Sequence, residues 1–443
     1  MGGTALAGPT ETAAHRMLER VIGTSAAAQI SLALRSPAIG TDGNPSEEFT
    51  IDGVPGNIVI QATTPSALTQ GAGWYLKYVA RADVMLRGSA PALAAQLPAP
   101  PATIRRVASV PHRYAFNDTN DGYTDPYLPW AGWENQLDLM ALHGINEVYI
   151  TVGTDTVFYQ LMQRYGYAED EVRRWIPDPA HQPWWVLQNM AGGDFPISQA
   201  LLAKRAETGR RIADRARELG ITPVFPGYWG TVPTDFATRN AGADVVQQGT
   251  WVGYERPAWL NPTTPLFQQI AADYYALSAQ ILGDSTMYKL DPMHEGGQLG
   301  QVNLTHAATA IETALQAARP GATWVILAWE GNPSNVLLAG IADKSRLLLL
   351  ASEADRYPTW DSAQRWPDVP YALGSIYNYG GRNIMGANAR ATVERWFADR
   401  QGPNAHRLRG VALFSEAWTA NPAVAELLSE LPWHDTPFAL DDW

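Results

Sequence analysis

From about residue 112 onward, strand-like segments alternate with helical ones, and this alternation constrains the fold more than any other feature. The helical patterns, such as 133–144 and 201–220, end in glycine, the usual C-terminal stop of a helix. Strands separated by helices form a parallel sheet, and eight of them predict a (β/α)₈ TIM-type barrel, an α/β fold. The expected strands are 145–153, 221–230, 245–253, 286–293, 323–331, 346–354, 371–381 and 410–418. The pattern over 245–253 is the weakest, so the expected count is seven or eight.

The first hundred residues have a different rhythm and predict a small α+β domain. Residues 11–35 read as a helix followed by a strand, and residues 47–84 read as strand, turn, strand and helix. The Pro- and Ala-rich stretch 89–104 is typical of a linker. We therefore expect an N-terminal domain with its linker over 1–104 and a catalytic barrel over 105–435.

Composition excludes several classes of function. The 443-residue chain has a net charge of −12, which argues against a nucleic-acid partner, since phosphate binding needs a basic face. No run of about 18 apolar residues predicts a membrane span. Cysteine is absent and the eight histidines are scattered, so we expect no metal site, and no motif calls for a cofactor.

Polar and aromatic residues gather where the expected strands end, which is where TIM barrels place their sites. Core packing does not require such one-sided clustering. The chain is also rich in aromatic residues, with 17 Trp and 18 Tyr, and flat rings suit sugars as well as they fill cores. The strand-end residues are Thr154, Asp155, Tyr228, Trp229, His294, Glu295, Trp329, Glu330, Glu353, Asp355, Asn378, Tyr379, Glu416 and Trp418.

Among these residues, Glu295 and Glu416 are the pair that we single out. Hydrolysis of a glycosidic bond needs a carboxylic acid that protonates the leaving oxygen and a carboxylate on the other face of the sugar. Two strand-end glutamates far apart in sequence can face each other across a barrel mouth. Glu330 and Glu353 occupy similar positions and compete for the role. Asp291, four residues before Glu295, is expected to point into the barrel interior or to support another residue of the site, rather than to act in catalysis.

Several longer segments resemble glycoside hydrolase family 89, the α-N-acetylglucosaminidases. The resemblance implies a retaining exo-glycosidase whose partner is a carbohydrate with terminal α-linked N-acetylglucosamine. Residues alone also leave open a barrel glycosidase of different sugar specificity, or a weakly catalytic sugar-binding protein. The segments that carry the resemblance are 113–146, 223–233, 288–297, 376–381 and 415–433.

The resemblance also implies roles for individual residues. Glu295 would be the general acid and base, and Glu416 the nucleophile. The family's substrate contacts match Asn117, Thr119 and Tyr123, and, with less distinct flanks, Trp185 and Trp329. Two strand-end residues, His294 and Asn378, complete the expected substrate-binding set.

Family members carry a C-terminal all-helical domain that completes the cleft. The resemblance implies that residues 436–443 begin this domain and that the rest of it is absent, which would leave a more open site. The family also suggests a secreted or periplasmic protein, although the opening MGGTALAGPTETAAH lacks the basic and apolar regions of a signal peptide.

Overall fold

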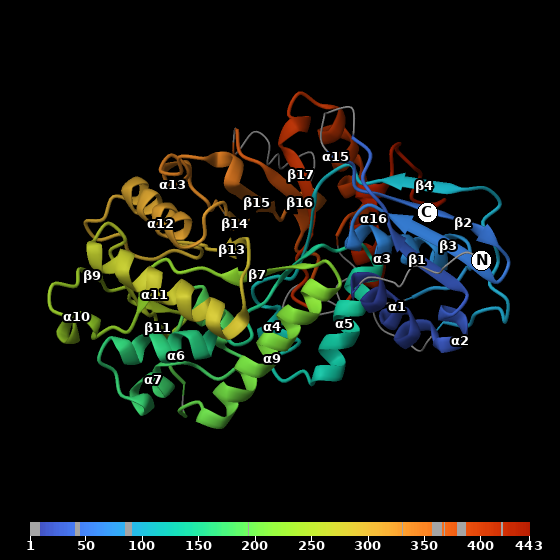
Figure 1. The fold of residues 1–443 in the computed structure, drawn as a ribbon. Helices are drawn as coiled ribbons and strands as arrows, with labels where there is room; N and C mark the ends of the chain where they lie inside the picture. Colours follow the sequence, from blue (N-terminus) through green and yellow to red (C-terminus); the bar gives the residue numbers. More distant parts are fainter. Residues whose placement is uncertain are drawn as a thin grey trace.

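The protein is described by a computed structural model that covers residues 9–39, 45–84, 91–193, 195–329, 331–356, 366, 368–378, 387–417 and 420–443. Three residues named above, Glu330, Tyr379 and Trp418, lie outside these ranges. A small sheet with its helices packs beside a larger barrel, and both chain ends lie on the side of the small sheet (Figure 1).

The predicted barrel is confirmed. Eight parallel strands close on themselves in the order β13-β14-β15-β16-β17-β5-β6-β7, with β7 pairing to β13. The strands are β5 (His112–Ala115), β6 (Glu147–Tyr149), β7 (Thr222–Pro226), β13 (Met287–Lys289), β14 (Thr323–Ala328), β15 (Leu347–Ala351), β16 (Tyr371–Ser375) and β17 (Leu408–Leu413).

One expected strand is wrong, and one barrel strand escaped prediction. Residues 245–253 form no barrel strand, because Gly249, Val252 and Gly253 all have positive φ angles of 71°, 42° and 92° that turn the chain. They instead supply β9 (Val245–Val246) and β10 (Thr250–Trp251) to small sheets outside the barrel. The missing barrel strand is β5, whose four residues before a polar run gave no alternating pattern.

Helices cover the outside of the barrel, and their starts are set by local sequence. Ser198 and Thr264 accept hydrogen bonds from backbone N–H groups of the first turns of α9 and α11. The predicted glycine stops hold, since Gly144 and Gly220 have φ angles of 68° and 75°. The helices are α5 (Trp130–Leu142), α6 (Thr154–Arg164), α7 (Glu169–Trp175), α8 (Gln182–Val186), α9 (Gln199–Glu218), α11 (Pro265–Leu282), α12 (Leu304–Ala318), α13 (Asn335–Leu338), α15 (Ala389–Gln401) and α16 (Pro422–Glu430).

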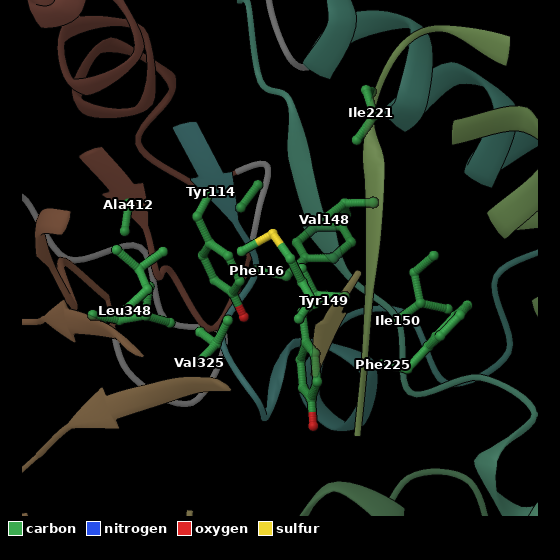
Figure 2. Packing of buried hydrophobic residues seen from close by; sticks show 14 of the residues in the cluster. Tyr114, Phe116, Val148, Tyr149, Ile150, Ile221, Phe225, Val325, Leu348 and Ala412 are labelled. Carbon is green, nitrogen blue, oxygen red and sulfur yellow. The ribbon is translucent and has the colours of Figure 1, made fainter. Parts of the chain in front are cut away.

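The barrel interior is filled by alternating side chains from its strands (Figure 2). Tyr114 of β5 and Tyr149 of β6 lie side by side there, together with Val325 of β14 and Leu348 of β15 (Figure 2). All four are nearly inaccessible to solvent, so the barrel is a packed core and its chemistry has to lie at an open end.

The N-terminal domain has the predicted α+β character. Its sheet has the order β1-β3-β2-β4, with β1 parallel to β3 and β2 antiparallel to both neighbours. The described helices include none long and apolar enough to cross a membrane. The elements are α1 (Pro9–Ile22), α2 (Thr24–Ala27), β1 (Ile30–Leu34), β2 (Glu48–Val54), β3 (Asn57–Ala62), α3 (Pro65–Tyr78) and β4 (Ile104–Val107).

Candidate active site

Glu295 and Glu416 follow strands on opposite sides of the barrel. Glu295 comes six residues after β13, and Glu416 comes three residues after β17. In the closed sheet β14, β15 and β16 separate the two strands on one side, and β5, β6 and β7 separate them on the other. Both side chains are partly exposed, as groups that meet a substrate must be. The fold therefore places one glutamate after each of two barrel strands that lie on opposite sides of the barrel.

The turn that carries Glu295 is held from its neighbouring strand end. Met293 has a φ of 62°, so the chain bends sharply just before the glutamate. The side-chain amide of Asn332 donates to the carbonyls of Met293, at 2.8 Å, and of His294. The backbone of Asn332 also exchanges hydrogen bonds with Trp329, the residue that follows β14. Trp329, His294 and Glu295 are thereby fixed relative to one another.

Two side chains from other loops reach Glu295. The Nδ2 of Asn189, in the long insertion between β6 and β7, donates to Glu295 Oε2 at 2.6 Å. The Nη2 of Arg256 donates to the backbone carbonyl of Glu295 at 2.7 Å. Burial lowers the pKa of the Arg256 guanidinium, and the nearby charge of Glu295 opposes that shift.

Glu416 is anchored through its backbone to the loop after β5. The hydroxyl of Thr124 donates to the carbonyl of Glu416 at 3.0 Å. Thr124 follows the short helix α4 (Asn120–Tyr123), whose Tyr123 stands edge-on to Trp184 of α8 with ring centroids 5.0 Å apart. Gly122 permits this approach, because a Cβ there would lie 2.8 Å from the Trp184 ring.

These contacts form a continuous path between the two glutamates. Trp184 closes it, since its backbone carbonyl accepts a hydrogen bond at 2.7 Å from the N–H of Asn189. The insertion that supplies α8 thus bridges the two catalytic candidates. In order, the path runs through Glu416, Thr124, Tyr123, Trp184, Asn189 and Glu295.

The other residues expected to contact the substrate differ in their burial and in their hydrogen bonds. Asn117 and Thr119 follow β5 directly and bond to each other, with Asn117 Oδ1 accepting from the Thr119 N–H and hydroxyl at 3.0 Å each. Tyr123 is exposed, and His294 is buried beside Glu295. Asn378, after β16, is fully buried, and neither its amide nitrogen nor its amide oxygen has a partner within the described part of the chain.

Trp185 is placed differently from its neighbour Trp184. Its side chain is 1% exposed and packs edge-on against Phe158 and Trp175, with ring centroids 4.8 and 5.1 Å away. The half-buried ring of Trp184 faces Tyr123 instead. The sequence WW alone does not show which of the two rings packs in the core.

Some strand-end carboxylates are committed to the scaffold. Asp155 is fully buried and accepts from Arg205 and from Gln182 at 2.8 and 3.0 Å. Glu353, the competitor of Glu295, accepts a hydrogen bond from Arg356 at 2.6 Å and is 6% exposed.

A buried charge cluster lies beneath the site in the barrel interior. Lys289 of β13 donates to both oxygens of Asp118, at 2.6 and 2.7 Å, and to Asp291. Burial alone would lower the pKa of Lys289, but the two carboxylates outweigh it and raise that pKa. Burial raises the pKa of Asp291, with Lys289 opposing and Asp118 adding to the shift. The interior position expected for Asp291 is confirmed.

Several residues of this site had no distinguishing mark in the sequence. Asn189, Arg256 and Thr124 lie in loops, far in sequence from the glutamates that they contact, and Trp184 lies in α8 between two of them along the path. Only Trp184 gave a signal, as half of an aromatic doublet. Within the described ranges, no cluster of three His, Asp or Glu side chains could hold a metal ion.

The family is decided by two matches that together cover most of the chain. Residues 113–435 match the alpha-N-acetylglucosaminidase (NAGLU) TIM-barrel domain, and residues 12–99 match the N-terminal domain of the same family. The chain belongs to the alpha-N-acetylglucosaminidase family. Its barrel and its N-terminal domain are those of that family.

Individual members of the family agree with this assignment. Human alpha-N-acetylglucosaminidase is 25% identical over an alignment of 451 residues that covers 98% of this chain and 60% of the human protein. A family 89 glycoside hydrolase from Clostridium perfringens, solved with 2-acetamido-1,2-dideoxynojirmycin, is 28% identical with a TM-score of 0.91, covering 98% of this chain and 49% of that one.

The C. perfringens enzyme has also been solved with its substrate, GlcNAc-alpha-1,4-galactose, in a variant with two glutamates changed to glutamine. That structure matches with 28% identity and a TM-score of 0.92, over the same shares of the two chains. The chain thus spans about half to three-fifths of the length of these relatives.

Proposed function

We propose that this chain is a retaining exo-glycosidase that removes terminal α-linked N-acetylglucosamine by double displacement. The observation that carries the proposal is the placement of Glu295 and Glu416 at the ends of opposite barrel strands, joined by a path of direct contacts. An anomeric carbon between them would meet one carboxyl group on each face, as glycoside hydrolysis requires.

In the first step, Glu295 donates its proton to the glycosidic oxygen while the bond from that oxygen to the anomeric carbon breaks. The carboxylate of Glu416 forms a bond to the same carbon from the opposite face. In the second step, Glu295, now a carboxylate, takes a proton from water as the water oxygen bonds to the carbon and Glu416 departs. Two inversions return the α configuration.

The stereochemistry of the substrate explains why the enzyme supplies the nucleophile. The 2-acetamido group of an α-linked glucosaminide lies on the same face as the leaving group, so it cannot attack from behind. A protein carboxylate has to take that position, and Glu416 is our assignment.

The sugar would be bound by residues around the same mouth. Asn117, Thr119, His294 and Asn378 offer polar groups, and Tyr123 and Trp329 offer rings. The burial of Trp185 moves the expected aromatic contact from that residue to Trp184, whose ring is half-buried beside Tyr123.

The relatives support this assignment. The C. perfringens enzyme was captured with its α-linked GlcNAc substrate after two glutamates had been changed to glutamine. In that chain the two changed positions are almost as far apart in sequence as Glu295 and Glu416. Changing a proton donor and a nucleophile to glutamine is the expected way to preserve a bound substrate.

Azide chemistry tests the two roles separately. With an aryl α-N-acetylglucosaminide, Glu416→Ala should release a β-glycosyl azide, because azide attacks in place of the missing nucleophile. Glu295→Ala should release an α-glycosyl azide, because azide intercepts the glycosyl-enzyme. Near-normal hydrolysis by Glu416→Ala, or the opposite pair of anomers, would overturn the assignment.

The substrate class is tested with a panel of aryl glycosides. We expect turnover of the α-N-acetylglucosaminide and none of the α-glucoside, β-N-acetylglucosaminide or α-galactoside. Turnover of another member would point to a different specificity. Calorimetric binding of GlcNAc without any product release would leave a sugar-binding role.

A further inference from the structure

The two oxygens of Glu295 have different surroundings. Oε2 accepts the short hydrogen bond from Asn189 Nδ2, at 2.6 Å. Across the described residues, no other side chain donates to this carboxyl group, so Oε1 has no side-chain donor among them. A carboxylic acid carries its proton on one oxygen, and an oxygen that already faces an N–H donor is the unfavourable one.

Asn189 is held as rigidly as a positioning residue requires. It is fully buried, and its backbone N–H is bonded to the Trp184 carbonyl at 2.7 Å. Arg256 ties the two loops together, since its guanidinium donates to the carbonyls of both Gln188 and Glu295, at 3.4 and 2.7 Å. The amide therefore cannot drift away from the carboxyl group without moving both loops.

The orientation of the amide depends on Glu295 alone. Asn189 Oδ1 is buried and has no hydrogen-bond partner among the residues that the structure describes. Burying an unpaired carbonyl oxygen is unfavourable, and a purely structural asparagine would use it. The Nδ2 end of the side chain therefore donates to the carboxyl group, and the Oδ1 end accepts no hydrogen bond from the described residues.

From these observations we propose that Asn189 is a positioning residue that selects Oε1 of Glu295 as the oxygen that carries the transferable proton. The inference rests on the proposed function and refines the role of one of its residues. In the first step the proton leaves Oε1 for the glycosidic oxygen as the bond to the anomeric carbon breaks. The negative charge left on the carboxyl group is then stabilised by the N–H of Asn189 on Oε2. In the second step Oε1 takes the proton back from water.

The test compares two substrates that depend differently on protonation. The leaving group of 2,4-dinitrophenyl α-N-acetylglucosaminide departs as a stable anion, whereas the methyl glycoside needs a proton on its leaving oxygen. Asn189→Leu keeps the approximate size of the side chain but removes the donor without adding a charge, and Asn189→Ala removes the whole amide. The matched control is Gln188→Leu, because Gln188 is buried in the same loop and donates to the Ala258 carbonyl at 3.0 Å rather than to Glu295.

We expect both Asn189 variants to lose roughly 10- to 100-fold in kcat/KM on the methyl glycoside, the range for a hydrogen bond to a charged group. On the dinitrophenyl glycoside the first step should change by less than about threefold, because protonation contributes little there. Gln188→Leu should lower both rates by the same factor. Circular dichroism verifies folding, and if Asn189→Ala does not fold, the similarly sized Asn189→Leu carries the test.

Equal losses on both substrates would overturn the inference, and so would the same discrimination in Gln188→Leu. A wild-type chain that hydrolyses neither substrate would instead overturn the proposed function on which the inference rests.

Discussion

Glu430, at the seam between α16 and the N-terminal domain, and Glu295, at the open end of the barrel, are both carboxylates in crowded surroundings, but their partners differ. Glu430 accepts from the ammonium of Lys77 at 2.7 Å, the hydroxyl of Tyr78 at 2.6 Å and the indole of Trp443 at 2.8 Å. Lys77 and Tyr78 belong to α3 and Trp443 to the C-terminal segment, so the carboxylate joins these two segments to α16.

Among the residues that the structure describes, the carboxyl group of Glu295 has one side-chain donor, the neutral amide of Asn189, and the residue is partly exposed. Saturating a carboxylate with cations and hydroxyls stabilises its charge and leaves no lone pair for a substrate. A carboxylate that supports the fold is thus surrounded by many donors, and one that reacts with a substrate by few.

Removing a reacting carboxylate should have the largest effect. We expect Glu416→Ala to lower kcat by a factor on the order of 10⁴ or more, because the nucleophile has no substitute. Its melting temperature should stay within a few degrees of the wild type, since the anchoring contact from Thr124 goes to the backbone. Initial rates measure the fall in kcat, and calorimetry measures the melting temperature. Loss of activity accompanied by a large fall in melting temperature would contradict the prediction.

The cluster under the site sharpens the contrast, because it lies close to the mouth yet is fully paired. Lys289→Met should destabilise the fold by about 3–5 kcal/mol, since it leaves the Asp118 and Asp291 carboxylates buried without their cation. Denaturant unfolding measures the loss. Lys204→Met, at an exposed lysine of α9, is the control and should stay within about 0.5 kcal/mol of the wild type.

The seam predicts a pH signature. Burial opposes the ionisation of Glu430, but His434 and Lys77 outweigh it and lower its pKa to about 2. Because the folded pKa lies below the unfolded value of about 4.3, the group stabilises the fold fully above that value, by about 3 kcal/mol. The stabilisation is lost as the pH falls through about 2. Glu430→Gln should be less stable than the wild type at neutral pH.

The test for the seam is urea unfolding of both proteins over a pH series. The gap between them should close as the pH falls from about 4.3 towards 2. Glu394→Gln, at an exposed glutamate of α15, provides the matched control. A gap that is independent of pH would contradict the account, and so would full loss of activity in folded Glu430→Gln.

The smallest effect is expected at the anchor of Glu416. Thr124→Val keeps the shape of the side chain and removes the hydroxyl that donates to the Glu416 carbonyl. We expect a loss of about 1 kcal/mol, seen as a few-fold fall in kcat with KM little changed, because the nucleophile is less well fixed. A rise in KM with kcat unchanged would instead assign Thr124 to substrate binding.

The barrel could be predicted because strand and helix patterns are local, and the period of each segment shows its type. The first strand, β5, escaped because the polar run from Asn117 follows its few apolar residues almost at once, and 245–253 misled because its apolar residues lie between turn glycines. The positions of Glu295 and Glu416 followed from their place at strand ends.

The surroundings of those glutamates could not be predicted in the same way. Asn189 and Arg256 reach Glu295 from loops more than 30 positions away, and no local pattern encodes such a contact. The doublet at 184–185 shows the same limit, since only the packing of α8 decides that Trp185 is buried and Trp184 is turned to Tyr123.

The most direct test of the central claim is the anomer that is released first. Proton NMR recorded immediately after mixing the wild-type chain with an aryl α-N-acetylglucosaminide separates α- from β-N-acetylglucosamine before mutarotation. Double displacement through Glu416 and Glu295 predicts that α-N-acetylglucosamine forms first. Initial release of the β anomer would show a single displacement by water and would contradict the assignment of a protein nucleophile.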